Sequence, residues 1–245
     1  MKPLLIIKTG AALPSIGRQY GEFEDFILRQ LAMDARKCLV VPVFQRRRLP
    51  AVKEVAGVVI TGSHAMVTDR APWSEYVADW LRRIPPGALP VLGICYGHQL
   101  LAQAFGGEVG YHPQGLEIGS VPIELTEAGR ADPLLGCLPS SFSGYALHAQ
   151  TVYRLPAGAA QLAKNSFEQY HAFRLRENMW GVQFHPEFSA EITRAYIEAQ
   201  KHELAQAGYD VVRLKEQVRG QRHGKMLLKR FLTLVKACGD SIRSK

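Results

Sequence analysis

Short apolar runs alternate with amphipathic segments through the first hundred residues of the chain. The runs are almost uniformly hydrophobic, which is typical of strands that helices cover on both faces of a parallel sheet. Such alternation indicates parallel strands joined by helical crossovers. The predicted strands are 4–8, 38–44, 55–61 and 90–94, and the predicted helices are 21–34, 73–84 and the segment that follows residue 95.

The pattern changes after the glycine pair at 106–107. Shorter strand-like runs then follow one another with turns between them, which favours a mixed or antiparallel extension of the sheet. The spacing over 189–201 predicts a helix, and 208–224 reads as a loop or broken helix. The runs are 108–111, 116–125, 144–147, 161–164, 170–174 and 179–184. We therefore expect one α/β domain over residues 1–245, with a mostly parallel open sheet flanked by helices.

Size and composition agree with one soluble globular domain. The chain has 245 residues and is 47% hydrophobic. It has no apolar run of about 18 residues, and the apolar start after Met1-Lys2-Pro3 is too short for a signal peptide. Four cysteines without close paired spacing indicate neither a disulfide framework nor a metal site. We expect a cytoplasmic protein without a cofactor and without a membrane partner.

The net charge of +8 is concentrated near the C-terminus. Residues 201–245 contain 11 Lys and Arg against 4 Asp and Glu. Basic and apolar positions are interleaved over 220–245, which predicts an amphipathic terminal helix with one buried and one solvated face. The alternative is a docking surface for an acidic partner or nucleic acid, but the solvated face is the simpler interpretation, and we expect no nucleic-acid partner.

The most informative residue is Cys95. It lies in Gly93-Ile94-Cys95-Tyr96-Gly97, between the apolar run that ends at Ile94 and the helix-like segment that follows. This is the layout of a nucleophile elbow, in which flanking glycines let a tight turn close and leave the central side chain exposed above the sheet. A helix N-terminus also favours thiolate over thiol. Cys95 is therefore the candidate nucleophile. Cys38, Cys137 and Cys238 are expected to be small buried hydrophobes.

A cysteine nucleophile needs a base, and the base needs an acceptor that orients it. His185 ends the apolar run 179–184 and is followed by Pro186 and Glu187. Extended backbone before proline would place the side chains of His185 and Glu187 on the same side. We expect His185 to be the base and Glu187 its orienting acceptor.

The oxyanion of a tetrahedral intermediate needs two donors. In an elbow one donor is the backbone N–H of the residue after the nucleophile, here Tyr96. The second donor is expected from the turn after the run 55–61, where the N–H of Gly62 is the candidate, with Ser63 beside it.

Three motifs together closely resemble the triad-type, or class I, glutamine amidotransferases, in particular the free-standing subgroup similar to the glutaminase part of GMP synthase. They are 93–99 (GICYGHQ), 185–187 (HPE) and 61–63 (TGS). The similarity extends over most of the chain through 6–10, 148–156 and 180–184. The resemblance implies a flavodoxin-like glutaminase fold.

The resemblance also implies a reaction. Cys95 would attack the side-chain amide of glutamine and form a γ-glutamyl thioester, while His185 shuttles the proton and Glu187 orients it. The ammonia released would pass to an acceptor site, which could belong to a separate synthetase subunit. Gln99, which shares a helix face with Cys95, and the backbone near Leu147 and His148 would hold the amino-acid end of glutamine.

Two positions depart from the family pattern. The chain has Gly62-Ser63 where the family often has Gly-Gly, and His148-Ala149-Gln150 where it has His-Gly-Asp. No glycine-rich phosphate loop follows residue 187, so we do not expect a complete GMP synthase. Two alternatives stay open: a γ-glutamyl hydrolase that acts on γ-glutamyl amides or peptides with the same machinery, and a non-catalytic regulatory or docking module.

Overall fold

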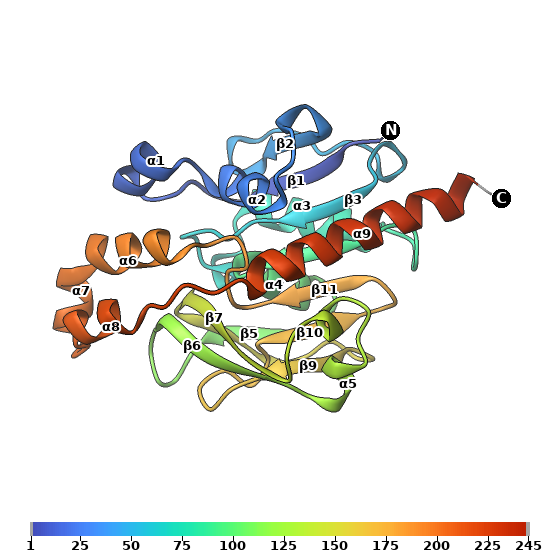
Figure 1. The fold of residues 1–245 in the computed structure, drawn as a ribbon. Coiled ribbons are helices and arrows are strands. Elements are labelled where there is room, and N and C mark those ends of the chain that lie inside the picture. The colour runs from blue at the N-terminus through green and yellow to red at the C-terminus, as the bar shows by residue number, and fades with distance from the viewer. Residues whose placement is uncertain (1, 244–245) are drawn as a thin grey trace.

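Nine strands in the described part of the chain form one sheet (Figure 1). The computed structural model describes residues 2–243, with side chains described up to residue 239. The strand order is β2-β1-β3-β4-β11-β10-β9-β6-β7. The strands are β1 (Leu4–Lys8), β2 (Cys38–Pro42), β3 (Gly57–Ile60), β4 (Val91–Ile94), β6 (Glu117–Leu125), β7 (Ser141–His148), β9 (Ala160–Lys164), β10 (Ala172–Leu175) and β11 (Met179–Val182).

The sheet has a parallel half and an antiparallel half. Strands β2, β1, β3, β4 and β11 pair in parallel, whereas β10, β9, β6 and β7 continue the sheet in antiparallel pairs. The predicted α/β fold class with an antiparallel extension is therefore confirmed, while the domain boundaries 1–245 stay a prediction. Strand β11 joins the two halves, and its carboxyl end leads to His185.

Helices cover both faces of the parallel half. Alternate residues of β1 belong to different core clusters: Leu4 and Ile6 face α2 (Phe23–Leu31) and α9 (His223–Arg243), and Leu5 and Ile7 face α3 (Pro72–Arg82) and α4 (Tyr96–Ala104). Figure 1 shows α9 running across the sheet beside α2. Burial on both faces explains why these strands are continuously apolar.

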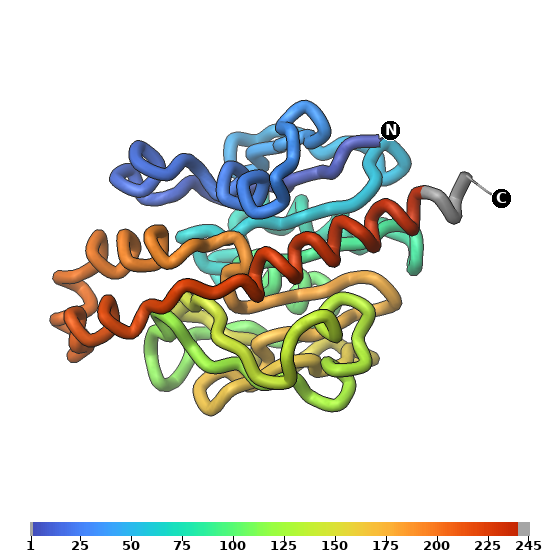
Figure 2. The backbone as a smooth tube through the Cα atoms, viewed as in Figure 1, coloured from blue at the N-terminus to red at the C-terminus, as the bar shows by residue number. Residues whose placement is uncertain are grey.

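Several short helices gather at the carboxyl edge of the parallel strands. They are α1 (Pro14–Tyr20), which follows β1, and α6 (Ala190–Ala199), α7 (Lys201–Gln206) and α8 (Val211–Gln217), which follow β11. In the tube view of Figure 2 these segments lie together at one end of the molecule. This edge is where open α/β sheets place their sites. The remaining helix, α5 (Glu127–Arg130), lies against β9.

The structure corrects several predicted elements. Residues 150–154, assigned to no element, form β8 (Gln150–Arg154), which pairs with β5 (Glu108–Tyr111) in a separate two-stranded sheet. Of the loop or broken helix predicted over 208–224, the structure shows the broken helix, since α8 lies within this segment, and the strand predicted over 38–44 ends at Pro42. The basic helix predicted over 220–245 begins at His223, and residues 244–245 lie outside the described residues. Among the described helices, none is long and apolar enough to span a membrane.

Candidate active site

Cys95 occupies the turn between β4 and α4, in a backbone conformation that side chains rarely adopt. Its φ is 50° and its ψ is −100°. The turn is fixed from the β11 side, because the Cys95 N–H donates to the Val182 carbonyl at 2.9 Å. The strand-turn-helix geometry predicted for an elbow is present, and Cys95 is the N-cap residue of α4.

Glycine is required on both sides of this turn. A Cβ on Gly93 would lie 2.9 Å from the His98 nitrogen and still closer to the Gly97 carbonyl. A Cβ on Gly97 would lie 2.6 Å from the Ile60 carbonyl oxygen of β3. Both contacts are shorter than packing allows, so the glycines permit the turn to close and α4 to lie directly on the sheet.

The Cys95 side chain is less exposed than the sequence predicted. The residue is only 6% exposed, since the end of β7 closes over it and the thiol donates to the Leu147 carbonyl at 3.6 Å. The other three cysteines are half-buried, not fully buried as predicted. Cys95 is thus the most enclosed of the four thiols.

His185 and Glu187 face each other as predicted. Glu187 Oε1 lies 2.8 Å from His185 Nδ1, and both side chains are buried. The imidazole is stacked on the ring of Phe188, with ring centroids 4.0 Å apart. The His185 N–H donates to the Tyr145 carbonyl of β7 at 2.7 Å. The ring is therefore held by its backbone, by a carboxylate and by an aromatic face.

Gly62 lies beside both Cys95 and His185. A Cβ added to Gly62 would be 3.0 Å from His185 Cε1 and 3.7 Å from Cys95 Cβ. The turns after β3, β4 and β11 therefore meet at one point, as the neighbouring carboxyl ends of parallel strands must. A side chain at position 62 would press against the His185 ring.

Electrostatics in this cluster favour a charged imidazole. Burial by itself would lower the pKa of His185, but the negative charges of Glu187 and of a Cys95 thiolate outweigh it and raise the pKa to about 10. His185 is therefore an imidazolium at neutral pH, the form that can give a proton to a leaving group.

The two predicted oxyanion donors flank Cys95. Tyr96 is the first residue of α4, where the backbone N–H has no acceptor within its own helix. The Gly62 carbonyl accepts from the hydroxyls of Thr9 at 2.9 Å and Thr61 at 3.0 Å, which fixes the orientation of this turn. The hydroxyl of Ser63 is engaged elsewhere, since it donates to the Thr9 carbonyl at 3.0 Å.

Comparison with known proteins agrees with this geometry. A family model described as Glutamine amidotransferase class-I matches residues 19–204. The chain belongs to the class I glutamine amidotransferases. The family predicted from the motifs, and with it the expected enzyme class, is therefore confirmed.

Relatives within the class I glutamine amidotransferases have different lengths. A protein from Archaeoglobus fulgidus named as a subunit of a glutamine-hydrolysing GMP synthase is 32% identical over 192 residues, which are 74% of this chain and 95% of the relative. The GMP synthase of Aeropyrum pernix is 34% identical over 179 residues, which are 73% of this chain and only 33% of that protein. The chain thus spans about a third of the length of the longer relative.

Two further matches are a hydrolase of a γ-glutamyl amide and a solved amidotransferase structure. A γ-glutamyl-L-1-hydroxyisopropylamide hydrolase from Pseudomonas is 29% identical over 163 residues, 62% of this chain and 54% of the relative. The crystal structure of a glutamine amidotransferase from Thermotoga maritima has a TM-score of 0.76 at 22% identity, covering 96% of this chain and 99% of that chain. The latter supports the amidotransferase fold.

The predicted substrate residue Gln99 is buried. Its amide group donates to the Gln150 carbonyl at 2.8 Å and to Gln183 Oε1 at 3.0 Å. It therefore does not face solvent, although it shares the helix face of Cys95. The amide hydrogens of Gln99 are engaged within the protein, and its role as a substrate contact stays a prediction.

The predicted substrate residue His148 belongs to a second buried polar cluster. Its Nε2 lies 2.8 Å from Glu117 Oε2 and its Nδ1 lies 2.9 Å from the Gln150 carbonyl. His171 and Asn165 contact the same carboxylate at 3.2 Å and 2.7 Å, and these partners hold the pKa of Glu117 well below its usual range although burial opposes this. The His148 ring thus faces this cluster, whereas the neighbouring Leu147 carbonyl contacts Cys95.

Gln150 stands where the amidotransferase family has aspartate, and its side chain has a structural partner. Its Oε1 accepts from the Val67 N–H at 3.1 Å, and its Nε2 donates to the Thr68 hydroxyl at 2.6 Å. Sequence reasoning did not identify this contact, nor those of Tyr145 and Phe188 with His185. Only the departure from the family motif drew attention to position 150.

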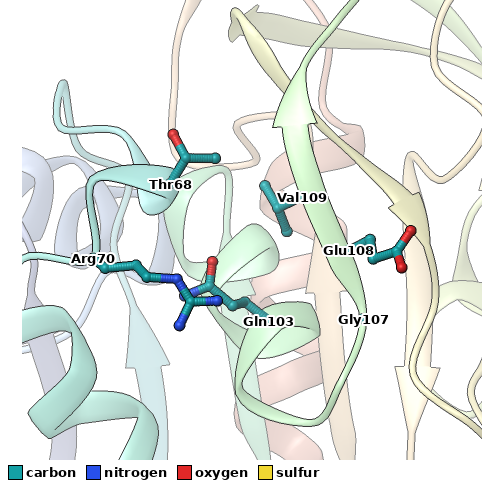
Figure 3. Close-up of a pocket in the computed structure, with 6 residues that line it drawn as sticks. All are labelled: Thr68, Arg70, Gln103, Gly107, Glu108 and Val109. Carbon is teal, nitrogen blue, oxygen red and sulfur yellow. The ribbon is translucent and has the colours of Figure 1, made fainter.

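A surface hollow of about 200 Å³ lies at the far end of α4. Figure 3 shows its lining, with Thr68 and Arg70 on one side and Gln103 and Val109 nearby. Gln103 lies eight residues from Cys95, or about 12 Å along the helix axis. Cys95, His185 and Glu187 do not line this hollow, so we assign it no catalytic role.

Proposed function

We propose that the chain hydrolyses the side-chain amide of glutamine and releases glutamate and ammonia. The observation that carries the proposal is the buried contact of 2.8 Å between His185 Nδ1 and Glu187 Oε1. The His185 ring and Cys95 both lie next to Gly62. An intact nucleophile, base and orienting carboxylate argue against a purely regulatory or docking module.

The proposed reaction begins from the Cys95 thiolate and the His185 imidazolium. The thiolate attacks the amide carbon, and the N–H groups of Tyr96 and Gly62 stabilise the oxyanion that forms, each worth about 3–4 kcal/mol. His185 gives its proton to the amide nitrogen, so that the C–N bond breaks and ammonia leaves. The product is a γ-glutamyl thioester on Cys95.

Water then releases the product. The neutral His185 takes a proton from a water molecule whose oxygen attacks the thioester carbon. The C–S bond breaks, glutamate leaves, and the thiolate and imidazolium are restored. Glu187 stays ionised throughout, and holds the His185 Nδ1 hydrogen so that Nε2 faces the reaction. We assign Gln99 and the Leu147–His148 backbone to binding the amino-acid end of glutamine.

The ammonia acceptor is proposed to be a separate synthetase subunit. Support comes from the relative in Archaeoglobus fulgidus, which is named as a subunit of GMP synthase. The match covers 95% of that subunit. Co-purification with, or glutamine-dependent stimulation of, a synthetase from the same source would test this assignment.

Ammonia release from glutamine tests the reaction. Wild type should release ammonia, and Cys95→Ala should release none above background. Mass spectrometry after incubation with an electrophilic glutamine analogue should find label on Cys95 alone. Equal rates for the two proteins, or label on Cys38, Cys137 or Cys238 instead, would contradict the proposal.

A second candidate is the hydrolysis of γ-glutamyl amides with larger amines. The Pseudomonas relative, named as such a hydrolase, favours it. A panel of γ-glutamyl alkylamides separates the two, because a strong preference for them over glutamine would favour this candidate.

A further inference from the structure

A segment that follows the family match contacts the catalytic turn. Residues 218–224, here named the connecting segment, join α8 to α9 and follow the end of the family match at residue 204. The segment has almost no secondary structure of its own, yet Val218 is fully buried. Its position is therefore set by its contacts with the rest of the protein.

Those contacts are made with β6, β7 and α6. The Arg194 side chain donates to the Val218 carbonyl at 2.6 Å, and the Arg219 N–H donates to the Ser120 hydroxyl at 3.3 Å. The His223 ring lies 3.2 Å from the Ser143 carbonyl. The connecting segment is therefore anchored by hydrogen bonds near both of its ends.

Tyr145 links this segment to His185. Its hydroxyl donates to the Arg219 carbonyl at 2.8 Å, and its own backbone carbonyl accepts from the His185 N–H at 2.7 Å. One residue of β7 thus touches the connecting segment with its side chain and the catalytic histidine with its backbone.

Gly224 makes the second link. A Cβ at this position would lie 2.7 Å from Pro186 Cα and 2.8 Å from its carbonyl carbon, with the carbonyl oxygen nearer still. Pro186 lies between His185 and Glu187, so the first turn of α9 packs directly against the backbone that carries both side chains. The Gln221 side chain accepts from the Gly224 N–H at 3.2 Å and fixes this turn.

We propose that the connecting segment sets the position of the His185 ring relative to Cys95, and that Gly224 and Tyr145 are positioning residues for the amide hydrolysis. This proposal rests on the proposed function for its kinetic readout. Misplacement of a catalytic group by about 1 Å can cost roughly 100-fold in rate, so a methyl group between Gly224 and Pro186 is a severe perturbation.

Gly224→Ala is the decisive variant because its effect on helix propensity is favourable, whereas its clash with Pro186 is unfavourable. Alanine is favoured over glycine within a helix, so without the Pro186 contact the change would be harmless. Gly220→Ala is the matched control, since a Cβ on Gly220 would meet nothing within 4 Å. We expect Gly224→Ala to lower kcat at least about 10-fold with little change in KM for glutamine, and Gly220→Ala to behave as wild type.

Alkylation of Cys95 by iodoacetamide gives a readout that needs no glutamine. The pH profile of its rate is compared in wild type, His185→Ala, Gly224→Ala and Gly220→Ala. We expect the pH profile of Gly224→Ala to shift toward that of His185→Ala, and Gly220→Ala to keep the wild-type profile. If wild type releases no ammonia, the proposed function fails while this comparison still tests the positioning role.

Wild-type kcat and a wild-type alkylation profile in Gly224→Ala would overturn the proposal. If circular dichroism shows that Gly224→Ala does not fold, Tyr145→Phe decides, because it removes only the hydrogen bond to Arg219. We expect Tyr145→Phe to lower kcat and shift the alkylation profile in the same direction. A folded Tyr145→Phe protein that matches wild type in both measurements would then refute the positioning role.

Discussion

The backbone of Cys95 carries strain at the site where chemistry is proposed. A non-glycine residue at φ 50° and ψ −100° is held there by its surroundings, here by the hydrogen bond to Val182 and by the packing of α4 on β3. Such conformations cost about 1–3 kcal/mol and concentrate at functional sites. The conformation directs the thiol toward Leu147 and Gly62.

We predict that Cys95→Gly is more stable than Cys95→Ala although both are inactive. Glycine adopts this conformation without steric cost, whereas alanine keeps the strain, so the free energy of unfolding should differ by about 1–2 kcal/mol after the greater chain entropy of glycine is subtracted. Urea denaturation of the two variants measures the difference. A Cys95→Gly protein that is equally or less stable would show that the turn is not strained.

The charge of His185 depends on Glu187, so Glu187→Gln should change the pH dependence of catalysis. In wild type the pKa of His185 is raised to about 10, and the imidazolium needed to protonate the leaving amide nitrogen persists up to that pH. Removing the carboxylate charge lowers this pKa and moves the alkaline limb of kcat/KM to lower pH, with a loss of activity of about 10-fold or more. An unchanged alkaline limb would contradict the assigned role.

The same pair should make stability depend on pH with a defined sign. Because the folded-state pKa of His185 lies above its unfolded value of about 6.5, the stabilisation is fully present below that value and is lost as the pH rises through about 10. The difference in unfolding free energy between wild type and Glu187→Gln should therefore shrink from pH 6 to pH 10. Denaturation series across this range measure it.

Sequence reasoning proposed the reactive side chains but did not foresee the contacts that support them. Cys95, His185 and Glu187 follow apolar strands, and the spacing of two between His185 and Glu187 places both on one side of extended backbone. Their contacts with Tyr145 and Phe188, and the enclosure of Cys95 beneath Leu147, depend on which distant strands are neighbours. A local pattern has no information on that arrangement.

At the scale of elements, α4 depends on a close backbone approach to β3. Its second residue, Gly97, lies against the Ile60 carbonyl of β3, where a Cβ would be 2.6 Å away. This contact lets the helix N-terminus, with the Tyr96 N–H, lie at the end of the sheet beside Gly62. The helix position, and with it the proposed Tyr96 donor, thus depends on Gly97.

We predict that Gly97→Ala destabilises the fold by about 1–3 kcal/mol, since the added methyl group must push the helix from the strand. The loss should appear as a lower midpoint of thermal unfolding and lower activity. Gly239→Ala, in α9 with no atom within 4 Å of its added Cβ, is the control and should be neutral or slightly stabilising. Equal midpoints for the two variants would contradict the close packing of α4.

The elements that sequence patterns missed share a physical cause. Strand β8 has the sequence QTVYR, which lacks the apolar-polar alternation of a half-buried strand, and it forms because β5 pairs with it. Helices α7 and α8 are six and seven residues long, near the lower limit at which periodicity is visible. Strands β1, β3 and β4 are only four or five residues long, but they were predictable because every residue in them is buried.

At the scale of the whole molecule, α9 combines a structural face with a charged face. Leu227, Leu228, Phe231 and Val235 are buried in the core that also contains β1, β3 and β4, while Lys225, Lys229 and Lys236 are exposed. This matches the predicted amphipathic helix with a solvated face. Burying four such side chains is worth about 6–12 kcal/mol, comparable to the whole stability of a domain.

Two variants therefore separate the two faces of α9. Truncation before His223 should yield insoluble or unfolded protein, because it exposes the apolar surface that α9 covers and removes Gly224 from Pro186. The triple substitution Lys225→Glu, Lys229→Glu and Lys236→Glu, which changes the net charge from +8 to +2, should keep the wild-type circular dichroism, midpoint of unfolding and ammonia release.

The triple variant also decides between the solvated face and a docking surface. Surface charges on a solvated face contribute little to stability, so their reversal should leave both activity and partner stimulation unchanged. If the basic face docks an acidic synthetase surface, reversal should abolish stimulation by that subunit while basal ammonia release persists, and raising the salt concentration should mimic the effect in wild type. If stimulation does not depend on salt and persists in the triple variant, the basic face of α9 is a solvated face and not a docking surface.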